Sequence, residues 1–219
     1  MAPRPLFRDR RDAGRQLADR LGEYADRDDV VVIGLPRGGV PVAFEVSLAL
    51  HAPLDVFVVR KIGFPGHEEL AIGAVASGGI RVLHREMLRR YDVPEAVVAD
   101  ATERALTELR ARERDMRGSR PAIPLAGRVA IVVDDGLATG MTMRAAALAL
   151  RRHGVAELVI AVPVAPPEAV ALVVREADVI VCGRTPEPFG AVGAWYQDFD
   201  QVGTDTVRRL LQHDDAGGS

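Results

Sequence analysis

Short apolar runs alternate with amphipathic stretches along most of the chain. The apolar runs are rich in β-branched residues and have the length of buried strands, and they lie at 30–35, 54–59, 129–133, 158–164 and 179–182. The stretches between them carry apolar residues at helical spacing, and they lie at 40–50, 94–116, 141–153 and from Pro167 onward. Strands that alternate with helices in this way predict an α/β fold with a doubly wound, mainly parallel sheet.

The segments outside this alternation predict smaller attachments to one core. Asp9 can cap a helix on the outside of the core, with Ala13 and Leu17 among its apolar positions. Residues 62–80 are rich in glycine, which predicts a flexible lid or a surface hairpin. The tail 183–213 breaks the alternation with prolines, glycines and a group of aromatic residues, so we expect it to fold back as a small hood.

Composition and charge place the chain in a broad class. A length of 219 residues with 48% hydrophobic content predicts one domain over 1–219, with a core at about 28–182. The net charge of -3, without any block of like charges, gives no indication of nucleic acid or of a membrane surface as a partner. We find no apolar run of membrane-spanning length and no signal-peptide pattern in the first 20 residues. A single cysteine, Cys182, allows no internal disulfide, and a cytoplasmic protein is therefore expected.

Polar and glycine-rich residues follow three of the predicted strands, and ligands of open α/β sheets bind beyond such strand ends. The third strand is followed by Asp134 and Asp135, which can accept hydrogen bonds from a vicinal diol. The next turn exposes backbone N–H groups at the start of a helix, where the helix dipole favours a phosphate. Together these features indicate a site for ribose 5-phosphate. The expected phosphate and ribose contacts after the acidic pair are Gly136, Leu137, Ala138, Thr139, Gly140, Met141 and Thr142.

The run 132–142 resembles the diphosphoribosyl-binding signature of the type I phosphoribosyltransferases, and 132–140 is especially similar to that of the adenine enzymes. The simpler alternative is an acidic turn followed by an ordinary capped helix. A Walker A loop and a dinucleotide-binding fingerprint are both excluded, because the lysine ending of the first and the glycine spacing of the second are missing. Ala138 replaces the aspartate with which hypoxanthine-type relatives handle a proton of the purine.

The resemblance extends to two further strand ends. The turn at 36–39 is similar to the family's pyrophosphate loop, in which Arg37 would assist the leaving diphosphate. Gly38 and Gly39 would permit unusual backbone angles and close approach. Arg60 and Lys61 follow the second strand, where relatives carry a basic residue that meets the diphosphate at the base of the lid. Lys61 is the only lysine of the chain, which suggests a site that requires a compact ammonium group; the alternative is a surface residue kept by chance.

The lid and the hood complete the expected site. In relatives the lid closes over the reaction and excludes water, and Glu68 and Glu69 are either lid contacts or solvated acids. The tail resembles the hood of hypoxanthine-type enzymes more loosely, with a spacing that differs by one residue on each side of a glycine. By that match Phe189 would stack on the base and Asp198 would face a magnesium ion.

The resemblance implies transfer of phosphoribose from 5-phosphoribosyl 1-diphosphate to a nitrogenous base, with release of pyrophosphate, as in nucleotide salvage. Asp134, Asp135, Lys61 and Arg37 would be catalytic, and Mg²⁺ would be held by Asp134, Asp135 and Asp198. We expect small-molecule substrates and a homodimer. A non-catalytic sensor of the donor and a hydrolase of the donor are the alternatives, and the acceptor base cannot be identified from the sequence.

Overall fold

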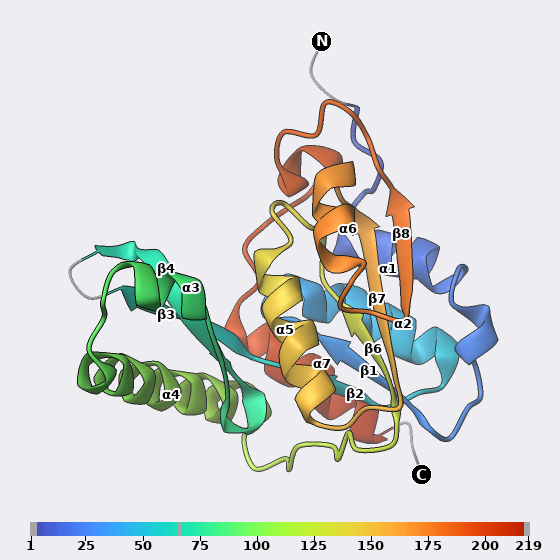
Figure 1. Ribbon diagram of the computed structural model, residues 1–219. Coiled ribbons are helices and arrows are strands. Elements are labelled where there is room, and N and C mark those ends of the chain that lie inside the picture. Colours follow the sequence, from blue (N-terminus) through green and yellow to red (C-terminus); the bar gives the residue numbers. More distant parts are fainter. Residues whose placement is uncertain (1–3, 65–66, 217–219) are drawn as a thin grey trace.

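The computed structural model describes residues 4–64 and 67–216, but not the side chains of 67–71 and 213–216. Five parallel strands form its central sheet. The strands lie in the order β2, β1, β6, β7 and β8 (Figure 1). This arrangement confirms the predicted α/β fold with a parallel sheet. The strands are β1 (Val30–Gly34), β2 (Leu54–Val56), β6 (Val129–Val133), β7 (Glu157–Val164) and β8 (Val179–Arg184).

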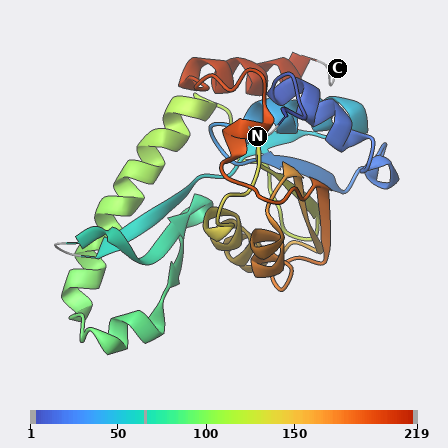
Figure 2. The ribbon, with the colours of Figure 1, turned by 90° about the horizontal axis from the view of Figure 1, so that it is seen from above.

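Helices cover both faces of this sheet. Alternate residues of β1 point to opposite faces: Val30 and Val32 belong to one buried cluster, whereas Val31 and Ile33 belong to another. The first cluster lies under α1 (Arg10–Ala18), α2 (Gly39–Leu50) and α7 (Thr204–Ala216), and the second under α5 (Met141–Arg152) and α6 (Pro167–Val173). Figure 2 shows the two groups of helices on opposite sides of the sheet.

Residues 59–117 form an arm that projects from the core (Figures 1 and 2). The predicted strand 54–59 is divided: β2 ends at Val56, and β3 (Val59–Phe64) begins a separate antiparallel sheet with β4 (His67–Ala76) and β5 (Ile80–Leu83). The expected lid segment 62–80 lies within this sheet. The arm also contains the turn η2 (Ser77–Gly79) and the helices α3 (Arg85–Arg90) and α4 (Glu95–Arg117).

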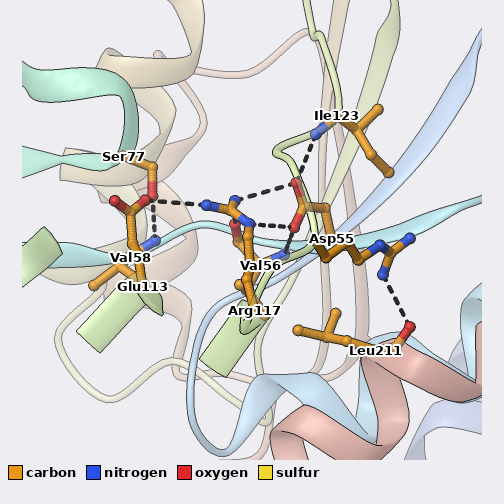
Figure 3. A network of polar contacts seen from close by, with 9 residues as sticks. Asp55, Val56, Val58, Ser77, Glu113, Arg117, Ile123 and Leu211 are labelled. Atoms are coloured by element: carbon orange, nitrogen blue, oxygen red, sulfur yellow. Dashed lines mark hydrogen bonds and ion pairs between the residues drawn. The ribbon is translucent and has the colours of Figure 1, made fainter. Parts of the chain in front are cut away.

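A buried ion pair joins the two places where the chain enters and leaves the arm (Figure 3). The carboxylate of Asp55, which is 3% exposed, accepts hydrogen bonds from Nε and Nη2 of Arg117 at 2.9 and 3.1 Å. It also accepts the N–H groups of Val56 and Ile123, at 2.7 and 3.0 Å. Because Asp55 belongs to β2 and Arg117 ends α4, this pair fixes the base of the arm to the sheet.

The hood is built from both ends of the chain. Phe7 pairs with the tail through its backbone, since its N–H binds the carbonyl of Trp195 at 3.0 Å and its carbonyl accepts the N–H of Gln197 at 2.9 Å. Phe7, Trp195 and Tyr196 are buried together. The tail contains the short helix η3 (Val192–Trp195) and ends in α7, which the sequence analysis did not predict. Among the described residues, no helix is both long and apolar enough to cross a membrane.

Candidate functional site

The carboxyl ends of β1 and β6 bring the turn 36–39 against the acidic pair. A Cβ atom on Gly38 would overlap the carboxylate of Asp135, and one on Gly39 would lie 2.6 Å from the carbonyl oxygen of Val133. Neither glycine has a positive φ, and Gly38 has φ -61°. A left-handed φ is therefore absent at both glycines, whereas the expected close approach is present at both. They are required because a side chain would separate the two loops.

Asp134 and Asp135 form a partly buried pair of carboxyl groups. Oδ1 of Asp134 accepts the backbone N–H of Asp135 at 2.8 Å. The pKa of Asp134 lies well above its ordinary value, because burial removes hydration from the carboxylate and the charge of Asp135 lies beside it. Burial also raises the pKa of Asp135, although its hydrogen bond with Arg10 acts in the opposite direction. Ionisation of both carboxyl groups is therefore unfavourable in the folded protein, which is typical of a binding or catalytic site.

Arg10 enters this site from the first turn of α1, and the sequence analysis missed it. Its Nε donates to Oδ2 of Asp135 at 2.8 Å, and its Nη1 donates to the carbonyl of Asp200 at 2.8 Å. The guanidinium carbon also lies 3.8 Å from the ring centroid of Phe199. A signal for it exists in the sequence, because Arg10 shares the helical stripe of the buried residues Ala13, Gly14 and Leu17.

Tyr196 adds a contact from the hood to the same residue. Its hydroxyl donates to the carbonyl oxygen of Asp135 at 2.5 Å, and burial raises the pKa of this hydroxyl. Arg10 and Tyr196 therefore hold the side chain and the backbone of Asp135, respectively. The hood takes part in the site directly through Tyr196, and indirectly through Asp200 and Phe199, which contact Arg10.

The loop that follows the acidic pair has an anchored part and an open part. Leu137 is buried and donates its N–H to the carbonyl of Val164 at 3.0 Å, and a Cβ on Gly136 would lie 2.7 Å from Cγ1 of Val192. These contacts anchor the start of the loop. Gly140 has φ +74° and precedes α5. The exposed residues of the loop are Ala138, Thr139, Met141 and Thr142.

The basic residues expected at the site lie in different places. Arg37 is exposed on the turn beside Asp135. Lys61 is exposed on β3 and lines cavities together with Thr142, which places it on the side of the phosphate loop. Arg60 forms an ion pair with Glu108 of α4, so that its guanidinium is already engaged within the arm.

The hood residues Phe189 and Asp198, which were expected to contact the base and the metal, make contacts within the hood. Phe189 packs in the hood, with its ring centroid 6.1 Å from that of Trp195. Asp198 is exposed, and its Oδ1 accepts the N–H of Asp200 at 3.2 Å. In the described part of the chain no group of three or more possible metal ligands occurs, so that Asp198 does not complete a site with the acidic pair. The side chains of Glu68 and Glu69 lie outside the described residues.

Known proteins resemble this chain over most of its length. A family model described as phosphoribosyl transferase domain matches residues 8–184. Proteins of two Mycobacterium tuberculosis strains, each provisionally named a phosphoribosyl transferase, are 51% identical over 207 residues, which is 94% of this chain and 46% of theirs. The chain thus spans about half the length of these curated relatives.

Solved structures are similar over nearly the whole chain. The crystal structure of TT1426 from Thermus thermophilus has a TM-score of 0.84 and 42% identity, and the match covers 94% of this chain and 98% of that one. A Neisseria gonorrhoeae protein whose structure contains bound ppGpp has a TM-score of 0.53 and 17% identity, over 97% of this chain and 98% of that one. The second likeness concerns the fold alone.

Proposed function

Because the chain belongs to the phosphoribosyl transferase family, we propose that it transfers phosphoribose from 5-phosphoribosyl 1-diphosphate to a nitrogenous base and releases pyrophosphate. The observation that carries this proposal is the contact between the two loops. The acidic pair lies against Gly38 and Gly39, and the exposed turn that begins α5 follows it after the buried residues Gly136 and Leu137. Two carboxyl groups that can bind a diol, with the turn 36–39 on one side and the turn 138–142 on the other, match a sugar that bears phosphate at both ends.

Each part of the site has a role in this reaction. Asp134 and Asp135 accept hydrogen bonds from the ribose hydroxyls and stabilise positive charge that develops on the sugar ring. The exposed turn at 138–142 binds the 5-phosphate. The Arg37 side chain and the backbone N–H groups of Arg37 and Gly38 stabilise the leaving diphosphate, whereas the N–H of Gly39 is bonded to Leu35. Lys61, which lines a cavity with Thr142, also stabilises the diphosphate.

The acidic pair also suits a magnesium ion that is shared with the donor. Mg²⁺ in sites for phosphorylated substrates is bound by one or two carboxylates together with phosphate oxygens and water. Asp134 and Asp135 offer two neighbouring carboxyl groups whose pKa values are raised by burial and, for Asp134, also by the charge of Asp135; a bound cation would favour their ionised forms. When bound, the ion would neutralise the diphosphate as it leaves. We do not include Asp198 in this set, because its contacts lie within the hood.

The wider setting follows from the same proposal. We propose a role in nucleotide salvage, a cytoplasmic location and a homodimeric state. Ala138 is exposed at the position where hypoxanthine-type relatives carry an acid. The proposed acceptor is therefore a base that needs no proton transfer to or from this loop.

The experiment is an assay of pyrophosphate release. The protein is incubated with the donor, Mg²⁺ and one member of a panel of purine and pyrimidine bases, and pyrophosphate is measured over time. We expect release that depends on one or a few bases. Release that is equal without any base would indicate a hydrolase, and saturable donor binding without release would indicate a sensor; either result would contradict the proposed transfer.

A further inference from the structure

A cavity of about 650 Å³ lies between β3, α4 and the first turn of α5. This volume is in the range of small-molecule binding sites. Within the described part of the chain, its lining contains Thr142 but neither the acidic pair nor the turn 36–39. The cavity thus adjoins the proposed donor site on the phosphate side and is separate from the loop proposed for the diphosphate.

The charges on the cavity wall are unbalanced. Arg60 and Glu108 form an ion pair and cancel each other. The other charged lining residues are Lys61, Arg104 and Arg112, and all three are exposed. No described residue forms an ion pair or a hydrogen bond with the side chains of these three. The wall therefore presents three positive charges that an anion could neutralise.

The sequence of α4 produces this wall. Ala101, Arg104, Ala105, Glu108 and Arg112 follow one another at helical spacing and line the cavity together. The small alanine side chains leave space for the cavity. Arg104 and Arg112 lie on either side of Glu108, which pairs with Arg60. Eight residues separate the two arginines, which corresponds to about 12 Å along the helix axis. A ligand with more than one negative group can contact both arginines.

We propose that this cavity is a second anion site, which binds a phosphorylated small molecule with more than one negative charge. Guanidinium groups suit phosphate oxygens because they donate paired hydrogen bonds in one plane. Phe64 and Val59 supply an apolar part of the lining for the uncharged portion of such a ligand. Since Lys61 and Thr142 line the cavity as well, its occupant lies next to the proposed 5-phosphate loop. This site does not depend on transferase activity.

The proposal is tested by calorimetric titration with inorganic pyrophosphate. The variant Arg104→Gln/Arg112→Gln removes both charges, and Arg110→Gln/Arg114→Gln is the matched control, because these arginines are exposed on the same helix outside the cavity lining. The wild type should show two binding events, of which one weakens at least tenfold in the first variant. The control should match the wild type, and equal thermal midpoints verify that the variants are folded.

Two results would overturn the proposal. One is an isotherm of Arg104→Gln/Arg112→Gln that equals that of the wild type. The other is a single event that weakens equally in this variant and in Arg37→Gln, because the arm arginines would then serve the donor's own diphosphate. Pyrophosphate release from the donor is measured separately, so that a failure of the proposed transfer reaction leaves this test unchanged.

Discussion

The guanidinium of Arg10 and the carboxylate of Asp135 lie 2.8 Å apart, although 125 residues separate them in the sequence. Their side chains are only 12% and 14% exposed. The pair joins the N-terminal helix to the acidic loop, and the hood encloses it through Asp200 and Phe199. A residue that belongs to no motif thereby orients the proposed ribose-binding carboxylate and favours its ionised form.

Replacing Arg10 should weaken both the fold and the reaction. Arg10→Gln leaves Asp135 without its cation, and the free energy of unfolding should fall by about 2 kcal/mol. Turnover should fall at least tenfold. Arg10→Lys should recover only part of it, because an ammonium group cannot contact Asp135, Asp200 and the Phe199 ring together. Urea unfolding and steady-state kinetics measure the two effects. Arg8→Gln is the control, since Arg8 is 70% exposed, and equal losses in both variants would refute the role of Arg10.

The two aspartates should respond to the same substitution with opposite changes in stability. Asp134→Asn removes a buried charge and keeps an oxygen that can accept the N–H of Asp135, so stability at pH 7 should rise by at least about 1 kcal/mol. Asp135→Asn loses the ion pair with Arg10, and stability should fall by about 2 kcal/mol. Both variants should lose turnover.

The stability gain of Asp134→Asn should depend on pH. The pKa of Asp134 is raised in the folded protein. Asp134 therefore destabilises the fold only at pH values above its pKa in the unfolded chain, which is about 3.9, because the unfolded chain then ionises more readily. Thermal midpoints measured between pH 7 and pH 4 should therefore show the gain shrinking as the pH falls. A gain that stays constant or grows toward pH 4 would contradict the assignment of a raised pKa.

The parts of the molecule that the sequence predicted correctly are those with a local pattern. The β-branched runs at 30–35 and 129–133 became central strands, and the turn 138–142 begins a helix as expected. The arm was not predicted at its full extent, because its strands mix glycines with partly exposed residues and obtain their order from pairing with one another. Arg10 was missed because its partner is distant in sequence, although its place on the buried stripe of α1 was visible.

The two glycines of the turn 36–39 should differ in their tolerance of a methyl group. A Cβ on Gly39 would meet backbone atoms of Val133 and Asp134, which cannot move aside. Gly39→Ala should therefore lower the free energy of unfolding by about 2 kcal/mol. A Cβ on Gly38 meets only the side chain of Asp135, so Gly38→Ala should reduce donor affinity more than stability.

Chemical unfolding and donor titration distinguish the two glycine variants. Gly22→Ala is the control, because open space surrounds the position of its Cβ atom and its φ is not positive. If Gly39→Ala were as stable as Gly22→Ala, the close contact between the two loops would not exist in solution.

Breaking the ion pair at the base of the arm should be among the most damaging polar substitutions. Arg117→Gln leaves the buried Asp55 without its cation, and we expect a loss of about 3 kcal/mol in the free energy of unfolding. Asp29→Asn breaks the exposed pair with Arg27 and should cost far less, because solvent screens that pair. Denaturant unfolding monitored by circular dichroism gives both values. Equal costs for the two variants would show that Asp55 and Arg117 do not hold the arm.

The identity of the product tests the proposed reaction most directly. The protein is mixed with 5-phosphoribosyl 1-diphosphate, Mg²⁺ and the base that stimulates pyrophosphate release, and the products are identified by mass. The account predicts a nucleoside 5′-monophosphate in amounts equal to the pyrophosphate released, and none with Asp135→Asn. Ribose 5-phosphate as the only sugar product, or unchanged product formation by Asp135→Asn, would contradict it.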